Sequence, residues 1–376
     1  MNKTSGPGRI LLLLLAALMC SAGAPEGQEI PHPVWPPPPD PPRVEYVNRI
    51  QGSRTFQREK AGFRLREKIG LPINTLDLEK PFDVAVDDDG RIFVTDTTRP
   101  GVIVLDAMNG VYQRWAESGP GAVAKGAGMA FDDQGNLYVA DTVIQRVAVL
   151  NPEGKLLRVI GSSKVFKRPT GVAVDGQRGR IYVSDVKAHD IKVFDTDGAL
   201  LQTIGARGIK PGYFNLPTFL ALGPDGSLYV ADTMNFRVQR LTPQGEPIST
   251  FGSVGAGPGF FNRLKGIDVD SQGRLLTVDA ASGRVQIFDD QGRLLLFFAD
   301  FGPYYGQLYL PAGMDVDANG NILVVSQLGA ALEHFRMLSE AEIAERAGKD
   351  TLRLYEERVR KEVETRESQQ VDEGSP

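Results

Sequence analysis

Apolar and polar positions alternate in a short motif that recurs along the chain. The motif is clearest at Ser227 to Leu241, SLYVADTMNFRVQRL, where Leu228-Tyr229-Val230 and the residues around Val238 flank the polar run Asp232-Thr-Met-Asn. Alternation with a period of two residues is typical of a half-buried β-strand, and a polar run between two such strands is typical of a tight turn. The motif therefore predicts a β-hairpin.

Five further copies of this hairpin begin at Arg91, Asn136, Arg180, Arg274 and Asn321. An apolar strand and a glycine turn precede each copy. The turn glycines lie 44 to 47 residues apart, at Gly90, Gly135, Gly179, Gly226, Gly273 and Gly320. A period in the forties with about four strands per repeat is typical of a β-propeller with one sheet per blade. The pattern predicts an all-β fold, a six-bladed β-propeller over residues 43–337.

An N-terminal strand is expected to complete the last blade. The segments that end earlier repeats, such as Leu156-Leu-Arg-Val-Ile-Gly and Ile248-Ser-Thr-Phe-Gly, have no counterpart after Phe335-Arg-Met in the sixth repeat. The strand that begins at Val44, VEYVNRIQG, has the required pattern. Closure by this strand removes the open sheet edge that would otherwise favour aggregation.

Residues 1–24 have the pattern of an export signal rather than of folded structure. Lys3 and Arg9 are followed by the apolar run Ile10 to Leu18, which is short for a bilayer span, and then by small residues from Ser21 to Ala24. We expect an exported protein of the cell envelope.

Cys20 is the only cysteine, and it directly follows this apolar run. A bacterial lipoprotein carries its lipid-modified cysteine at such a place, although Leu18-Met19 differ from the small residues that usually come before it. Two alternatives stay open, a periplasmic protein and a membrane-anchored lipoprotein. Cleavage before Cys20 or after the small residues that end at Ala24 leaves no disulfide in the mature domain.

Three segments lie outside the propeller. Residues 25–42 are rich in proline and are expected to form an extended spacer, since proline lacks a backbone donor. Residues 338–366 predict a charged α-helix that begins with a capping box of Ser339 and Glu342. The helix is expected to rest on the propeller or to contact a partner. Residues 367–376 are expected to be disordered.

The repeat resembles the NHL repeat, and Ala231-Asp-Thr-Met-Asn-Phe-Arg-Val-Gln carries the resemblance most clearly. The resemblance implies a propeller. It leaves the function open, because proteins with similar propellers include RNA-binding and protein-binding scaffolds, extracellular sensor domains, lyases and lactonases.

An Asp-x4-Arg spacing recurs in three repeats. It places a carboxylate and a guanidinium near the ends of paired strands in one blade, which predicts structural ion pairs rather than catalytic groups. The predicted pairs are Asp141 with Arg146, Asp232 with Arg237, and Asp279 with Arg284.

Two carboxylates interrupt an otherwise apolar position in the innermost strands. Asp268 and Asp315 stand where the first four repeats have Ala85, Ala130, Ala173 and Ala221. Such carboxylates could bind a divalent cation in the channel or raise each other's pKa, or they could accept backbone hydrogen bonds. The chain has three histidines, too few for the zinc site that resemblance to propeller lyases implies. We predict no other cofactor.

The connections between blades are the predicted binding face, because propellers bind on that face and arginine and aromatic side chains are typical of binding hot spots. Phe214 and Phe261 are expected to be buried between blades instead. The candidate binding residues are Lys164, Arg168, Arg207, Lys210, Tyr213, Arg263, Lys265, Tyr304 and Tyr305.

The formal net charge of -5 and the export signal argue against a nucleic-acid partner. We expect a binding or scaffolding propeller whose partners are envelope proteins, with membrane contact only through a signal or lipid anchor. The alternative is a metal-dependent enzyme of the lyase or lactonase kind, with its site at the central channel.

Overall fold

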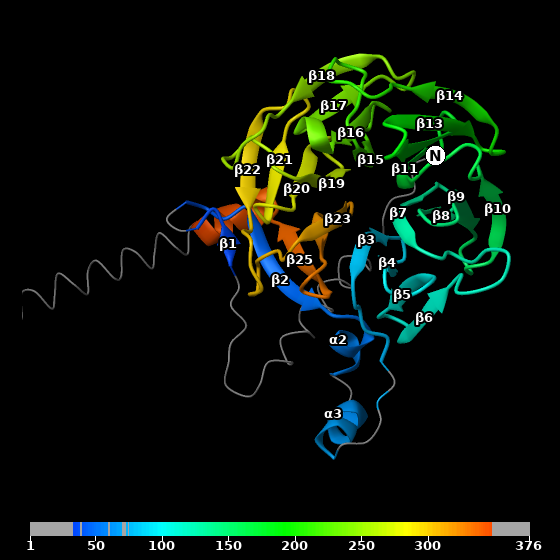
Figure 1. Ribbon diagram of the computed structural model, residues 1–376. Helices are drawn as coiled ribbons and strands as arrows, with labels where there is room; N and C mark the ends of the chain where they lie inside the picture. Colours follow the sequence, from blue (N-terminus) through cyan, green and yellow to red (C-terminus); the bar gives the residue numbers. More distant parts are fainter. Residues whose placement is uncertain (1–32, 38–39, 59–60, 70–72, 74, 348–376) are drawn as a thin grey trace, which may run out of the picture.

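The computed structural model describes residues 33–37, 40–58, 61–69, 73 and 75–347. Six antiparallel sheets surround a central channel, as Figure 1 shows, so the predicted all-β six-bladed propeller is confirmed. The predicted export signal, Cys20 and the C-terminal tail lie outside the described residues. In the described part of the chain no helix has the length and apolar character needed to span a bilayer.

Blades one to five each have four strands, ordered from the channel outward as in the sequence. Blades one and two comprise β3 (Pro81–Val86), β4 (Ile92–Asp96), β5 (Val102–Asp106), β6 (Val111–Trp115), β7 (Gly126–Phe131), β8 (Leu137–Asp141), β9 (Arg146–Leu150) and β10 (Leu156–Ile160). Blade three comprises β11 (Pro169–Asp175), β12 (Arg180–Asp185), β13 (Asp190–Asp195) and β14 (Leu200–Ile204). Blades four and five comprise β15 (Pro217–Leu222), β16 (Leu228–Asp232), the 3-10 turn η1 (Thr233–Asn235), β17 (Arg237–Leu241), β18 (Pro247–Phe251), β19 (Leu264–Val269), β20 (Leu275–Asp279), β21 (Arg284–Phe288) and β22 (Leu294–Phe298).

Blade six joins the two ends of the propeller. Its inner strands β23 (Pro311–Val316), β24 (Asn321–Ser326) and β25 (Ala331–Met337) are followed by β2 (Val44–Ile50), which pairs antiparallel with β25. The predicted closure by the N-terminal strand is therefore confirmed.

A fifth strand, β1 (Val34–Trp35), pairs with β2 inside the stretch expected to be a spacer. The Trp35 ring lies 5.8 Å from the ring of Phe298 and 5.7 Å from that of Phe335. Prolines on both sides keep β1 short, because proline has no N–H to donate to a sheet. This part of the chain thus packs on the seam between blades five and six.

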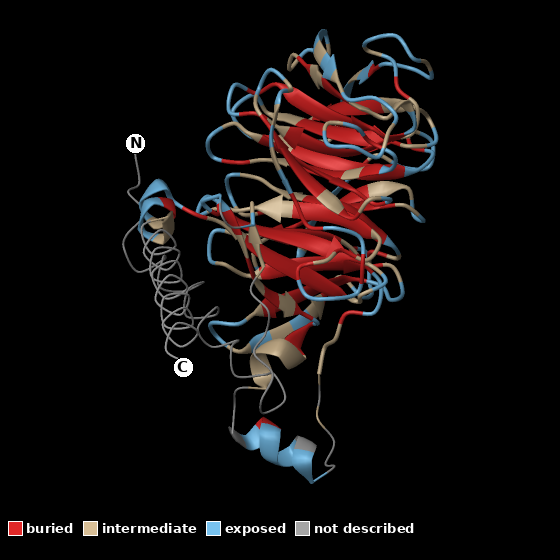
Figure 2. Ribbon diagram, turned by 90° about the vertical axis from the view of Figure 1, so that its left-hand side faces the viewer, coloured by how far each residue is buried: buried red, intermediate tan, exposed pale blue. Residues whose placement is uncertain are grey.

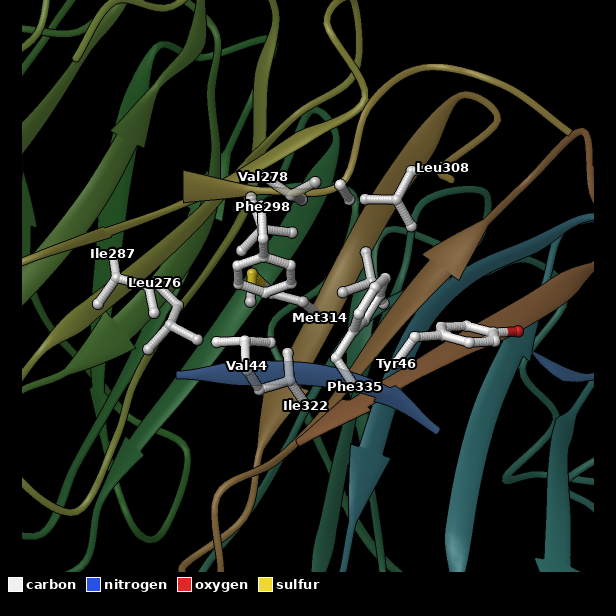
Figure 3. Packing of buried hydrophobic residues seen from close by; sticks show 13 residues of the cluster. Val44, Tyr46, Leu276, Val278, Ile287, Phe298, Leu308, Met314, Ile322 and Phe335 are labelled. Carbon is white, nitrogen blue, oxygen red and sulfur yellow. The ribbon is translucent and has the colours of Figure 1, made fainter. Parts of the chain in front are cut away.

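The hydrophobic core consists of six clusters, one between each pair of neighbouring blades. Figure 3 shows the cluster between blades five and six, to which β2 contributes Val44 and Tyr46. Figure 2 shows the buried residues along the strands and the exposed ones in the connections. The inner strands of each blade are therefore buried on both faces, which explains their continuous apolar runs, whereas the outer fourth strands alternate exposed and partly buried residues.

Two short helices lie in the connection from β2 to β3, at the outer edge of the ring (Figure 1): α2 (Ser53–Gln57) and α3 (Ala61–Lys68). Gly52 precedes α2 with φ 117°, and a Cβ there would overlap the backbone of Leu76. Only glycine fits this approach.

A C-terminal helix begins after β25, and residues 340–347 of it are described. The predicted capping box is present, since Ser339 N donates to the Glu342 carboxylate (2.9 Å) and Glu342 N donates to Ser339 Oγ (3.3 Å). Arg336 and Arg346 both bind Glu45 of β2. These ion pairs hold the start of the helix on blade six.

Candidate functional site

The connections from the fourth strand of one blade to the first strand of the next lie at one end of the propeller, together with the turns between second and third strands. We call this end the loop face. In blade three, Asp185 at the end of β12 accepts hydrogen bonds from the backbone N–H groups of Lys167 (2.6 Å) and Arg168 (2.8 Å). The equivalent residues, which bind the backbone of their own connections, are Asp96, Asp141, Asp232, Asp279 and, in blade six, Ser326. These side chains fix the loops around the channel entrance.

This role overturns two of the three predicted ion pairs. Asp232 and Arg237 form a salt bridge of 2.8 Å. Arg146 instead donates to backbone carbonyls of the preceding loop, and Arg284 pairs with Asp300 at 3.2 Å. Backbone N–H groups already occupy both carboxylate oxygens of Asp141 and of Asp279. The predicted pairs that do not form are Asp141 with Arg146 and Asp279 with Arg284.

Four basic residues occupy the same backbone position at the channel entrance, directly before an inner strand. In each, the backbone N–H donates to the aspartate at the end of the second strand, and the backbone C=O accepts from the N–H of the residue that follows that aspartate. They are Lys80, Lys125, Arg168 and Arg263. Sequence reasoning found Arg168 and Arg263 but missed Lys80 and Lys125. The signal was available, since each precedes the first residue of an inner strand.

The predicted residue Lys265 lies two residues deeper in the channel, on β19, and is partly buried. No hydrogen-bond or salt-bridge partner of its ammonium group exists among the described residues. Burial lowers the pKa of Lys265, and the nearby guanidinium groups of Arg263 and Arg168 lower it further. Three unpaired cations from blades three and five therefore share one side of the channel entrance.

An aromatic pair lies just below this entrance. Phe82 of blade one and Phe219 of blade four stack with ring centroids 5.7 Å apart and an interplanar angle of 21°. Blades one and four are opposite each other around the channel (Figure 1). The two aromatic rings therefore meet across the channel. They form an apolar floor beneath the cations.

Phe219 is the third residue of its inner strand. At the equivalent position four of the six blades have glycine, and blade one has Asp83. A Cβ at Gly128 or Gly266 would overlap the backbone of the next inner strand. Glycine is thus needed because the inner strands approach one another closely there.

The predicted channel carboxylates Asp268 and Asp315 lie deeper still. Asp268 accepts hydrogen bonds from the backbone N–H groups of Val269 (2.8 Å) and Val316 (2.7 Å). The backbone N–H of Val86 in blade one lies near the Asp315 carboxylate and favours its charged form. The Asp268 carboxylate therefore binds a free N–H group at the inner edge of the next blade, which is the backbone alternative left open by the sequence.

A third channel carboxylate, Asp83, was missed because it stands two positions earlier in its strand. It accepts a hydrogen bond from Met129 N at 2.8 Å. Burial raises the pKa of Asp83, raises that of Asp268 to about 7, and together with the charges of the other two raises that of Asp315. Among the described residues, no three His, Cys, Asp or Glu side chains converge to hold a metal ion.

The two described histidines each have a hydrogen-bond partner in the protein. His32 lies outside the described residues. His189 accepts a hydrogen bond from Leu216 N at 3.1 Å, and the buried His334 pairs with Asn321 Oδ1 at 3.1 Å. Both described histidines therefore have structural partners.

Glutamines of the third strands hold the aromatic connections of blades four and five. Gln239 accepts from Gly212 N (2.9 Å) and donates to Tyr213 O (2.7 Å). Phe214 and Phe261 are fully buried, as predicted, whereas Tyr213 is 45% exposed and projects from its loop.

Blade six uses different residues for the same purpose. Glu333 replaces the glutamine and is fully buried, with Arg49 Nε at 2.6 Å and the Tyr46 hydroxyl at 3.0 Å. Figure 3 shows the Tyr46 hydroxyl directed away from the apolar cluster. Arg49 also donates to Tyr304 O (2.9 Å) and lies 5.1 Å from the ring centroid of Tyr305. The N-terminal strand thus supplies the cation that positions these two tyrosines.

Exposed apolar side chains are distributed unequally between the two ends of the propeller. Among the described residues, the turns at the end opposite the loop face have one large exposed hydrophobic side chain, Met108, and eight more lie on the outer fourth strands. The connections and turns of the loop face, leaving the connection from β2 to β3 aside, have eleven: Val143, Ile144, Ile209, Tyr213, Met234, Val254, Phe260, Phe301, Tyr304, Tyr305 and Leu328. The exposed cations Arg207 and Lys210 lie in the same connection as Ile209 and Tyr213, and the exposed Lys164 lies in the preceding connection; all three were predicted.

Comparisons with known proteins agree with this architecture. The family model described as NHL repeat matches residues 166–194 and 214–241. No curated protein matches the chain at a significant level.

Solved structures resemble the chain over the propeller. An inactive variant of virginiamycin B lyase from Staphylococcus aureus with quinupristin has a TM-score of 0.53 at 15% identity, over 69% of this chain and 95% of that one. A gluconolactonase from Xanthomonas campestris has a TM-score of 0.55 at 18% identity, over 69% of this chain and 87% of that one. At such identity the likeness shows the fold alone. The chain therefore contains NHL repeats and folds as a six-bladed β-propeller.

Proposed function

We propose that the protein is a binding or scaffolding propeller that contacts a protein partner through its loop face. The unequal distribution of exposed apolar side chains between the two ends supports this proposal: eleven lie in the loop-face connections and turns outside the β2–β3 connection, and one, Met108, lies in the turns of the opposite end. Gathered apolar surface on a soluble domain is typical of a binding site.

The composition of the loop face fits a protein partner. Tyr213, Phe260, Tyr304 and Tyr305 are between 41% and 74% exposed. Arg207 and Lys210 lie in the same connection as Tyr213, and Lys164 lies in the preceding one. Exposed aromatic side chains next to cations are typical of interface hot spots. Arg49 and Gln239 hold these loops in place, so little ordering entropy is lost on binding.

Site-specific photocrosslinking tests the proposal. A photoreactive residue at Ile209 or Phe260 should give the same covalent adduct with a protein in living cells, whereas the residue at Met108 should give none. The three positions are 78%, 45% and 57% exposed, so reagent access is similar. Equal adducts from Met108, or none from any position, would contradict the proposal.

We further propose that the protein acts at the cell envelope, after export by residues 1–24. The supporting pattern is the charged start, the apolar run and the small residues of that segment. Cell fractionation should place the protein in the periplasm or the membrane fraction. Replacement of Cys20 by serine should move it from membrane to soluble fraction if the cysteine is lipid-modified, and should leave it unmoved if a signal peptidase cleaves the segment off.

A metal-dependent lyase or lactonase is not favoured by the residues present. Both carboxylate oxygens of Asp268 already accept backbone N–H groups, and no third ligand converges on Asp268 and Asp315 among the described residues. These side chains therefore do not fit a catalytic metal.

A further inference from the structure

The loop-face entrance of the channel has an excess of positive charge without a counter-ion. Arg168 and Arg263 hold equivalent backbone positions before the inner strands of blades three and five, and Lys265 follows Arg263 by two residues on β19. The two guanidinium groups lower the pKa of the lysine, as expected for cations at one entrance. None of the three side chains has an acidic partner among the described residues, although many other arginines do, such as Arg237 with Asp232.

The two aspartates that bind the backbone beside these cations have their oxygens occupied. Asp185 and Asp279 are buried, and their oxygens accept the backbone N–H groups of the very residues that carry the cationic side chains. They therefore fix the backbone of Arg168 and Arg263 but leave the guanidinium groups free to bind a ligand.

An apolar surface lies directly below the cations. The stacked rings of Phe82 and Phe219 meet across the channel. Phe82 stands at the strand position equivalent to that of Lys265, and Phe219 stands three residues past the position equivalent to that of Arg263. Phe82 remains partly exposed. A ligand at the entrance would therefore meet charge at its head and aromatic rings at its base.

We propose that this entrance binds a small organic anion, whose carboxylate or phosphate lies between Arg168, Arg263 and Lys265 and whose apolar body rests on Phe82 and Phe219. Guanidinium groups bind both kinds of oxyanion through paired N–H donors, and the ammonium group adds a point charge. The site does not depend on the proposed protein partner, because it lies inside the channel and not on the protruding loops.

Three probes separate the two halves of the site. Phenyl phosphate carries both an anion and a ring, inorganic phosphate carries only the anion, and benzyl alcohol carries the ring without charge. In calorimetric titrations of the purified protein at low salt, phenyl phosphate should bind most tightly, inorganic phosphate more weakly, and benzyl alcohol not measurably. Binding should weaken with ionic strength, since the charges are close to solvent.

Variants test the residues. Lys265→Met and Arg263→Gln should each reduce the affinity for phenyl phosphate roughly tenfold or more, because a charge-assisted hydrogen bond is lost. Phe82→Leu should reduce the preference for phenyl phosphate over inorganic phosphate. Arg293→Gln is the matched control, since Arg293 is an exposed cation of the opposite end, in the turn between β21 and β22.

A stability measurement distinguishes a ligand site from a structural one. Without ligand, Lys265→Met should raise the melting temperature by a few degrees, because an unpaired and partly buried cation is removed. With phenyl phosphate the wild type should gain stability and the variant should not.

Three results would overturn the proposal. They are no binding of phenyl phosphate, an affinity of the Lys265 and Arg263 variants equal to that of the wild type, or equal affinity of the wild type for inorganic phosphate and phenyl phosphate. Failure of the photocrosslinking experiment at Ile209 and Phe260 would leave these titrations unaffected.

Discussion

Arg49 and Glu333 are 284 residues apart in the sequence, and their side chains meet at 2.6 Å in blade six. The pair joins the N-terminal strand β2 to the third strand β25, and Arg49 continues to the loop that carries Tyr304. Ring closure and the shape of the binding face therefore depend on the same contact.

This pair gives the protein a pH-dependent stability. Burial raises the pKa of Glu333 to about 7 from an ordinary value of 4.5, despite the favourable charge of Arg49. The folded state thus holds a proton that the unfolded state has released, so this contribution is complete below about pH 4.5 and is lost as the pH rises to about 7. The upper limit of the effect is about 3 kcal/mol.

The variant Glu333→Gln tests this linkage. Between pH 5 and pH 8 the wild type should lose stability, and the variant should lose less, in urea unfolding monitored by circular dichroism. Glu153→Gln, which changes an exposed glutamate in the turn between β9 and β10, should behave as the wild type. An unchanged slope in the Glu333 variant would contradict the assignment.

Trp35→Ala should destabilise the propeller by about 2 kcal/mol, because it removes a half-buried ring that packs on Phe298 and Phe335. Chemical unfolding measures the change. Leu295→Ala on the neighbouring β22 is the control, since Leu295 is 53% exposed. Equal losses in both variants would show that β1 does not contribute to the seam.

Deletion of residues 43–52 should abolish the cooperative thermal transition, since it removes β2 and exposes the edge of β25. Differential scanning calorimetry measures the transition. A melting temperature equal to that of the intact chain would rule out closure by this strand in solution.

Asp268→Ala should destabilise the protein by about 2 kcal/mol, because the N–H groups of Val269 and Val316 lose their acceptor. The loss should be larger at pH 5 than at pH 8, since the pKa of Asp268 is raised to about 7 and its protonated form favours folding. Asp197→Ala, in an exposed turn of blade three, is the control.

The same Asp268 variant bears on the metal question. Calcium or magnesium should not shift the melting temperature of the wild type, because backbone groups already occupy the carboxylate oxygens. A saturable shift that is lost in Asp268→Ala would restore the cation site that the sequence suggested.

Arg237→Gln and Arg146→Gln should differ in cost although both sequences read Asp-x4-Arg. Arg237 pairs with the buried Asp232, so its loss should cost about 3 kcal/mol, whereas Arg146 binds only carbonyl groups and its loss should cost about 1 kcal/mol. Parallel urea titrations of the two variants measure the difference. Equal costs would mean that the ion pair in blade four adds nothing.

The sequence by itself determined the features that depend on local pattern and on repetition. Strand alternation and glycine spacing were enough to predict six blades, and the missing last strand of repeat six was enough to predict closure by β2. The capping box of Ser339 and Glu342 and the burial of Phe214 follow from local spacing in the same way. In each case the interacting groups lie within one repeat, or one repeat lacks what another segment supplies.

Only the tertiary structure decided which groups meet at the channel and at the seam. Phe82 and Phe219 become neighbours because their blades are opposite in the ring. Lys265 lies near the cations Arg168 and Arg263, which come from two blades, and the described residues supply no carboxylate partner for its ammonium group. The Asp-x4-Arg spacing failed in two blades because carboxylates at strand ends bind the nearest free N–H groups before a distant guanidinium. A period in the sequence sets how the chain pairs within a blade, whereas the contacts between blades depend on ring geometry that no single repeat contains.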